Sequence, residues 1–152
     1  MYRAKDKCQL ELENFILPFG GKLNPNNRWI QLARLIPWEE FEETYAENFS
    51  DDEWGAPAKP FRVALGALLI KEKQKITDRE TVEQIRENPY LQYLIGKKAY
   101  SDEEPFDASL MVHFRKRITD DMLREINERI HAERVKKNKQ KIKRLKKKKV
   151  LR

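Results

Sequence analysis

Residues 105–118, PFDASLMVHFRKRI, contain a helix start, an apolar face and a group of basic residues within fourteen positions. Asp107 and Ser109 carry side-chain oxygens that can accept hydrogen bonds from free backbone N–H groups at a helix start. The apolar residues that follow recur at helical spacing and share one face. They are Leu110, Met111, Phe114 and Ile118. The stretch therefore predicts a helix that begins between residues 107 and 109, ends near 118 and packs through one side.

The flanks and the opposite side of this helix carry His113, Arg115, Lys116 and Arg117, and no acid follows Asp107 within it. One interpretation is a surface that contacts phosphates or bases. The other is a solvated helix end, where positive charge interacts favourably with the helix dipole. For His113 the same two alternatives, solvent or nucleic acid, remain open.

Other helices are predicted from apolar residues at helical spacing between turn-forming residues. We expect them over residues 28–35, from 38 onward in an acidic segment, over 60–75, 78–88 and 89–95, and from 119 onward. Thr77 and Glu80 have the spacing of a capping box, and Pro89 suits a first helical turn. Gly66, among apolar residues, indicates a close crossing of two helices. Residues 50–59 are expected to form a loop.

A loose alternation of leucine and glutamate over residues 8–17 predicts a short N-terminal strand. The expected fold class is therefore all-α: a compact multi-helix domain with a helix-turn-helix-like unit, this short strand, and a basic C-terminal helix or tail that projects. We place the domain at residues 1–133 and the tail at 134–152.

Charge is divided unevenly between these two parts. Residues 134–152 contain twelve Lys and Arg and no acid, Lys136, Lys137, Lys143 and Arg144 among them. Removing these twelve from the 32 Lys and Arg leaves 20 against 25 Asp and Glu in residues 1–133, a net charge of −5. A basic tail can bind nucleic acid, or it can be a disordered extension whose charges repel one another.

Several kinds of site are not expected. The five glycines form no phosphate-binding motif, and Cys8, His113 and His131 are too scattered for a zinc site, so we expect no cofactor, no metal and no catalytic residue. The single cysteine allows no internal disulfide, and the longest apolar run, residues 63–70, is too short to span a membrane. We expect a cytoplasmic protein without membrane contact.

Five segments in this order resemble the N-terminal helical domain of bacterial insertion-sequence transposases of the Asp-Asp-Glu class. They are QLELENFILP at 9–18, NRWIQLA at 27–33, KPFRVALGALLIK at 59–71, TDRETVEQIRENPYLQY at 77–93 and FDASLMVHFRKR at 106–117. The resemblance covers roughly residues 8–133. It implies a helix-turn-helix domain that binds the terminal inverted repeats of an element during DNA transposition, with the nuclease further along the chain.

Because the chain ends at residue 152, where the resemblance would lead into a nuclease, we expect a truncated, non-enzymatic transposase remnant. Val135, Ile142 and Leu145 follow one another at seven- and three-residue steps, a short coiled-coil spacing, so a homodimer through the tail is one possible partner. Association with a full-length transposase is the other. The alternative is a non-catalytic module that binds nucleic acid or acidic proteins through its basic tail alone.

Two helices compete to read the DNA groove. Residues 78–88 follow a compact turn, as a recognition helix should, but carry four acids beside Arg79 and Arg86. Residues 108–118 lack such acids. We therefore expect Arg115 and Arg117 to matter more for DNA binding than Arg79 and Arg86.

Overall fold

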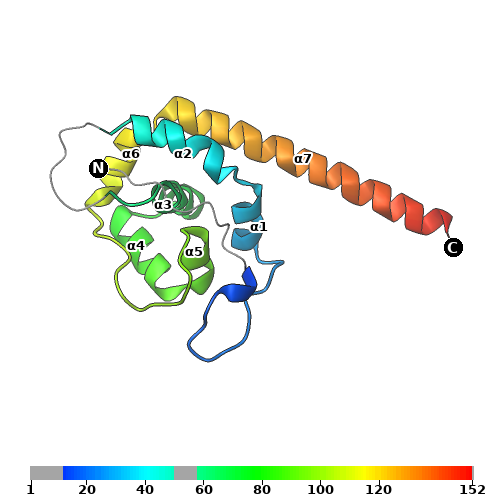
Figure 1. The fold of residues 1–152 in the computed structure, drawn as a ribbon, viewed down its shortest axis with the longest axis horizontal. Helices are drawn as coiled ribbons and strands as arrows, with labels where there is room; N and C mark the ends of the chain where they lie inside the picture. Colours follow the sequence, from blue (N-terminus) through cyan, green and yellow to red (C-terminus); the bar gives the residue numbers. More distant parts are fainter. Residues whose placement is uncertain (1–11, 50–57, 152) are drawn as a thin grey trace.

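The computed structural model describes residues 12–49 and 58–151, and these residues form an all-α fold with one compact body and one long projecting helix (Figure 1). The elements of this described part are a 3₁₀ helix η1 (Leu12–Asn14) and the helices α1 (Arg28–Leu35), α2 (Trp38–Glu47), α3 (Phe61–Gln74), α4 (Asp78–Glu87), α5 (Pro89–Leu94), α6 (Leu110–Arg117) and α7 (Asp120–Val150). The predicted all-α class is confirmed.

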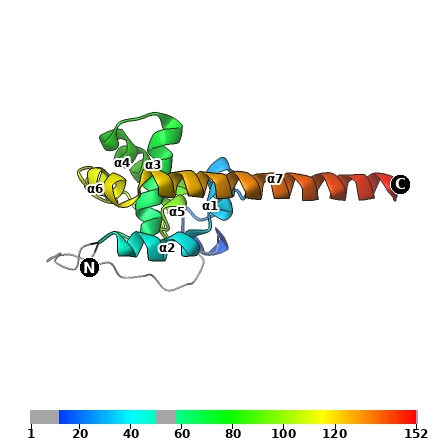
Figure 2. The ribbon, with the colours of Figure 1, turned by 90° about the horizontal axis from the view of Figure 1, so that it is seen from above.

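Helix α3 lies at the centre of the body, and α2, α4, α5 and α6 pack around it (Figures 1 and 2). Its apolar residues occupy almost every side, which is typical of a helix buried all round. From residue 64 to residue 70 every residue is buried. At Gly66 an added Cβ would lie 2.9 Å from Ile95 Cγ2, so the predicted close crossing is confirmed.

Local capping residues set the helix starts. The side chain of Asn27 accepts a hydrogen bond from Trp29 N at 2.9 Å, and that of Thr77 accepts one from Glu80 N at 3.1 Å. At the start of α7, Thr119 accepts one from Met122 N at 3.3 Å. These bonds satisfy N–H groups that the first helical turn leaves without a partner. The predicted starts at residues 28 and 78 are confirmed, and the helix predicted from 119 onward begins at Asp120 with Thr119 as its cap.

The predicted N-terminal strand is wrong where the structure describes it. Residues 12–14 form η1, and Ile16 makes a single parallel bridge to Ala99. Ile16 N donates to Lys98 O at 3.1 Å, and Tyr100 N donates to Ile16 O at 2.9 Å. Pro18 has no N–H with which to extend this ladder. Residues 8–11, including Cys8, and most of the predicted loop over 50–59 lie outside the described residues.

Helix α7 has two different halves. Met122, Ile126 and Ile130 are buried against the body, whereas nearly every residue from 131 to 150 is exposed and the helix extends well beyond the body (Figure 2). The helix continues through residue 134 without a break. Within residues 12–49 and 58–151, no helix has the length and apolar character needed to cross a membrane.

Candidate nucleic-acid interface

Helices α3 and α4 are joined by the three residues Lys75, Ile76 and Thr77. Lys75 adopts a left-handed conformation (φ 53°, ψ 52°), and the backbone N–H of Ile76 donates to Lys71 O at 3.3 Å. A left-handed residue at a helix end reverses the chain sharply and satisfies the last carbonyls. Two helices joined by so short a turn have the connectivity of a helix-turn-helix unit.

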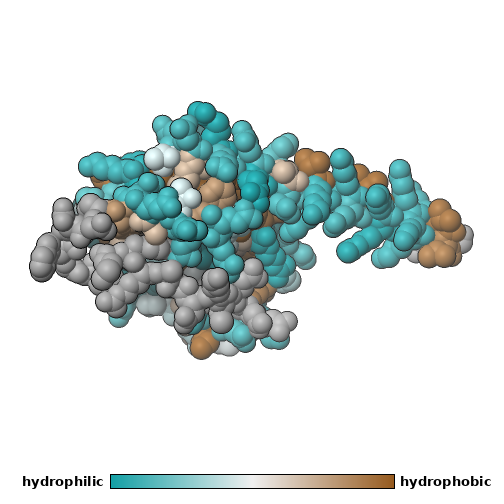
Figure 3. Space-filling view, turned by 45° about the horizontal axis from the view of Figure 1, so that its top comes forward, coloured by the Kyte–Doolittle hydropathy of each residue, from teal (hydrophilic) through white to brown (hydrophobic). Residues whose placement is uncertain are grey.

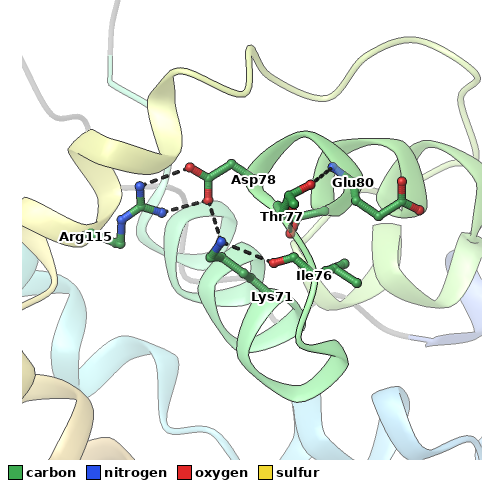
Figure 4. Close-up of polar contacts among 7 residues, drawn as sticks. Lys71, Ile76, Thr77, Asp78, Glu80 and Arg115 are labelled. Carbon is green, nitrogen blue, oxygen red and sulfur yellow. Dashed lines mark hydrogen bonds and ion pairs between the residues drawn. The ribbon is translucent and has the colours of Figure 1, made fainter.

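Asp78, the first residue of α4, joins three helices (Figure 4). Its two carboxylate oxygens accept hydrogen bonds from Arg115 of α6, at 2.8 and 3.0 Å, and Lys71 Nζ of α3 lies 3.0 Å from Oδ1. Lys71 Nζ also donates to Ile76 O in the turn at 3.2 Å. The hydrogen bonds from Arg115, above all, lower the pKa of Asp78, and the pKa of Arg115 is raised by the same contact.

This contact corrects the premise that no acid opposes the basic cluster of α6. Asp78 lies 37 positions before Arg115 in the sequence, and the fold brings the two together. A guanidinium held by both carboxylate oxygens is restrained in position and partly neutralised. Arg115 therefore acts first as a link between α4 and α6.

The other basic residues of α6 lie in different surroundings. The Arg117 guanidinium lies 3.9 Å from the ring centre of Phe49, and Arg117 O accepts a hydrogen bond from Asn48 Nδ2 at 2.7 Å. His113 and Lys116 are exposed. The opposite side of α6 is buried, as predicted, although Leu110 is only half-buried.

The two arginines of α4 differ as well. Arg79 is exposed near the helix start. Arg86 Nε donates to Asp102 O, and its Nη1 lies 3.8 Å from Glu83 Oε1. Arg86 therefore holds the loop that precedes α6, whereas Arg79 lies exposed in the first turn of α4.

The largest basic surface is the second half of α7. Residues 134–150 contain eleven Lys and Arg and no acid, and each of the eleven is exposed. Lys136, Lys137, Lys143 and Arg144 are among them. Seventeen helical residues span roughly 25 Å. The predicted tail is thus a helix in the structure, and its basic side chains lie on most sides of it.

Comparison with known proteins shows the family to which this chain belongs. Residues 18–117 match a family described as a transposase domain, DUF772. The chain belongs to this family. A curated relative, described as "Uncharacterized protein ORF8 in nfe locus" from Rhizobium meliloti, is 36% identical over 104 residues, which cover 68% of this chain and 49% of the relative. The chain thus spans about half the length of that relative. No solved structure matches this chain.

Sequence reasoning missed a buried residue that holds the transposase domain's helical unit together. Gln92 of α5 is fully buried, and its Nε2 lies 3.0, 3.1 and 3.0 Å from the carbonyl oxygens of Ile85, Arg86 and Ser101. Its Oε1 accepts a hydrogen bond from Ser101 N at 3.0 Å. In the sequence, the only sign of this role is that Gln92 is a polar residue within an apolar run.

Arg62 of α3 has a similar structural role. Its Nε and Nη2 donate to Leu94 O and Tyr93 O, each at 2.9 Å, at the end of α5. The guanidinium also lies 4.8 Å from the ring centre of Trp38. Burial lowers the pKa of Arg62, as expected for a charge removed from water. In the described part of the transposase domain, no group of three or more His, Cys, Asp or Glu could hold a metal ion.

Proposed function

We propose that this transposase domain binds the DNA ends of a transposable element. One observation carries the proposal: the second half of α7 projects from the body and exposes eleven basic residues without an acid. Lys and Arg that neutralise phosphates release condensed counterions, and this release supplies most non-specific affinity for DNA. Because residues 1–133 are acidic overall, α7 is the surface that would provide this affinity.

Sequence preference would come from the helix-turn-helix unit and the neighbouring α6. Base edges specify a sequence, whereas phosphate contacts mainly position the protein. Arg79 at the start of α4, and His113 and Lys116 on α6, are exposed side chains that can reach a groove. Arg115 would contact DNA only by exchanging its bond to Asp78 for one to a phosphate or base.

The proposed function is tested by the salt dependence of DNA binding. We compare the full chain with a variant in which Lys136, Lys137, Lys143 and Arg144 are changed to Gln. If all four charges reach phosphates, the slope of log K against log salt becomes shallower by about 0.9 × 4, or roughly 3.6. Equal slopes for the two proteins would contradict the proposed role of α7.

A matched variant controls for net charge. Lys22, Lys59, Lys73 and Lys98 are exposed on the body, and changing all four to Gln removes the same charge. We expect this variant to keep most of the original slope. A loss equal to that of the α7 variant would mean that total charge, and not α7, determines the affinity.

Sequence preference is measured separately, as the ratio of affinity for element ends to affinity for shuffled DNA of equal length. Arg79→Ala and Lys116→Ala should reduce this ratio, because loss of a base contact costs about 1–3 kcal/mol. A ratio near one for the unchanged protein would instead favour the alternative function, a nucleic-acid-binding module that acts through its basic helix alone.

We further propose that the chain binds without cutting. The test is incubation with element-end DNA and Mg²⁺, followed by denaturing electrophoresis. Nicking that disappears when a carboxylate is changed to its amide would show that the chain is a nuclease.

A further inference from the structure

A line of residues runs along one side of α7, from the half that packs on the body to the half that projects. Its members follow one another at steps of three or four positions: Leu123, Asn127, His131, Val135, Asn138, Ile142 and Leu145. At 100° per residue they fall within a sector of about 120°, which also holds Arg124 and Arg134. The sector borders the buried Ile130 and faces away from the buried Met122. This line is called the α7 stripe below.

The α7 stripe exposes three apolar side chains on the projecting half. Val135, Ile142 and Leu145 are 39%, 53% and 53% exposed. Figure 3 shows brown, hydrophobic side chains interrupting the hydrophilic surface of the projecting helix. Nearer the body, a shallow hollow follows the same side of the helix. It is lined by Asp120, Leu123, Arg124, Asn127, Glu128 and His131.

The two halves of α7 have opposite charge. Residues 120–133 contain five acids and two arginines, whereas residues 134–150 contain eleven basic residues and no acid. If two such helices lay side by side in parallel, lysine would face lysine along the whole projecting half. In an antiparallel pair, each basic half would face the acidic half of the other helix, so Coulomb attraction replaces repulsion.

We infer that two copies of this chain associate through antiparallel pairing of their α7 helices along the α7 stripe. The pairing is symmetric, because the same surface is used by both copies. It places Leu145 of one copy opposite Leu123 of the other, Ile142 near Asn127, and the two Val135 side chains near the symmetry axis. The hollow beside Leu123 then receives the apolar residues from the far end of the second copy.

The antiparallel arrangement also gives the helices enough overlap. Positions 123–145 span about three heptads, which is the usual minimum for a stable two-helix interface. Asn138 of one copy meets His131 of the other, and a polar pair within such a seam fixes register and orientation. Basic side chains outside the seam stay in solvent, so the inference neither requires nor prevents the proposed DNA binding.

Sedimentation equilibrium of the full chain over a concentration series is the first test. We expect a monomer–dimer equilibrium whose dissociation constant rises by roughly tenfold or more when Ile142 and Leu145 are both changed to Gln. The matched control changes Val150 and Leu151 to Gln. These residues are 84% and 86% exposed at the C-terminal end of the same helix but lie off the α7 stripe. The control should dimerise as the unchanged chain does.

Orientation is tested by disulfide cross-linking in a Cys8→Ser background, which removes the chain's one natural thiol. Chains with Leu123→Cys are mixed with chains with Leu145→Cys and oxidised. Antiparallel pairing predicts the mixed dimer, and little cross-linking of either variant alone. Cross-linking of Leu145→Cys with itself, in preference to the mixed product, would overturn the antiparallel arrangement.

Measuring dimerisation at different salt concentrations, and DNA binding separately, distinguishes a failure of this inference from a failure of the proposed function. The dimer should weaken, or stay as strong, when salt is raised; strengthening would indicate like-charged helices side by side. A chain that stays monomeric at about 100 μM, some hundredfold above a micromolar dissociation constant, overturns the inference even if it binds DNA. A dimer without DNA binding contradicts the proposed function alone.

Discussion

At the scale of single residues, Asp78 has the most consequential surroundings, because its carboxylate links α3, α4 and α6. Its folded pKa is lowered, chiefly by the hydrogen bonds from Arg115. A group with a lowered folded pKa stabilises the fold above its unfolded pKa, and this contribution disappears as pH falls through the folded value. The contribution of Asp78 is therefore present at neutral pH and lost in acid.

We predict that Asp78→Asn lowers the free energy of unfolding by about 1 kcal/mol at pH 7, since the network is partly exposed. The difference from the unchanged protein should shrink below about pH 4, near the ordinary pKa of aspartate. Urea unfolding at several pH values measures it. Asp121→Asn is the control, because Asp121 is 93% exposed. A difference that persists undiminished at pH 2 would contradict this account.

Gln92 supports a second prediction at this scale. Changing Gln92 to Leu leaves the carbonyl groups of Ile85, Arg86 and Ser101 without their side-chain partner in or near the core. Each unsatisfied buried polar group costs about 1–3 kcal/mol, so we expect a loss of about 2 kcal/mol or more. Thermal unfolding measures it, with Gln84→Leu on α4 as the control. Equal losses for the two variants would show that the buried network contributes little.

At the scale of secondary-structure elements, Phe114 tests the orientation of α6. It is 1% exposed, and its ring lies edge-on to Phe106 with centroids 5.3 Å apart. Removing a buried Phe side chain costs about 3–5 kcal/mol. We expect Phe114→Ala to lower stability by this amount, whereas Val112→Ala, at a position 43% exposed, should change it little. Chemical denaturation of both variants provides the comparison.

At the crossing of α3 and the end of α5, we predict that Gly66→Ala changes stability differently depending on the residue at position 95. An added Cβ at Gly66 meets Ile95 Cγ2 at 2.9 Å, so Gly66→Ala should cost about 1–3 kcal/mol through overpacking. In an Ile95→Ala background the obstructing methyl is gone, and the higher helix propensity of alanine should make the same change neutral or stabilising. A double-mutant cycle gives the coupling energy. Additive effects would mean that the two sites do not touch.

The elements also show which features the sequence could predict. The helices beginning at 28, 78 and 120 were predictable because Asn27, Thr77 and Thr119 act on N–H groups two or three residues away. The bridge between Ile16 and Ala99 was not, because the alternation of apolar residues near Ile16 does not say which distant segment pairs with it.

The candidate site also has features that the sequence could predict and features that it could not. The exposed basic half of α7 was predictable from composition alone, as was the inward side of α6 from helical spacing. The pairing of Arg115 with Asp78 was not, since it depends on where α4 and α6 come to lie around α3. Which side chains are available to bind a ligand is decided by such long-range contacts.

At the scale of the whole molecule, an acidic body carries a long helix, α7. Only the first half of α7 packs on the body, and the second half is basic. Arg129 Nη2 lies 2.7 Å from Glu40 Oε2 of α2, and Met122, Ile126 and Ile130 are buried. Beyond residue 131 the helix makes no comparable contacts with the described part of the body. Its order there depends on helix propensity and on the spacing of its charges.

The last prediction concerns how well this projecting half holds its helix. Nucleation is supplied by the packed half, so residues 134–150 need only propagate, and Lys, Arg and Gln are good helix formers. Opposing this, lysines at i and i+4, such as Lys139, Lys143 and Lys147, repel by about 0.2–0.5 kcal/mol per pair. We therefore expect amides of residues 134–150 to exchange much faster than those of 122–130.

Added salt or DNA should slow exchange in residues 134–150, because either one weakens lysine repulsion, while leaving residues 122–130 unchanged as an internal control. Hydrogen exchange followed by mass spectrometry measures both regions in one experiment. Dilute protein and the Ile142→Gln/Leu145→Gln variant separate this effect from protection by a second copy. Equal protection along the whole helix in low salt would mean that charge repulsion does not limit its order, and that DNA meets a helix already rigid.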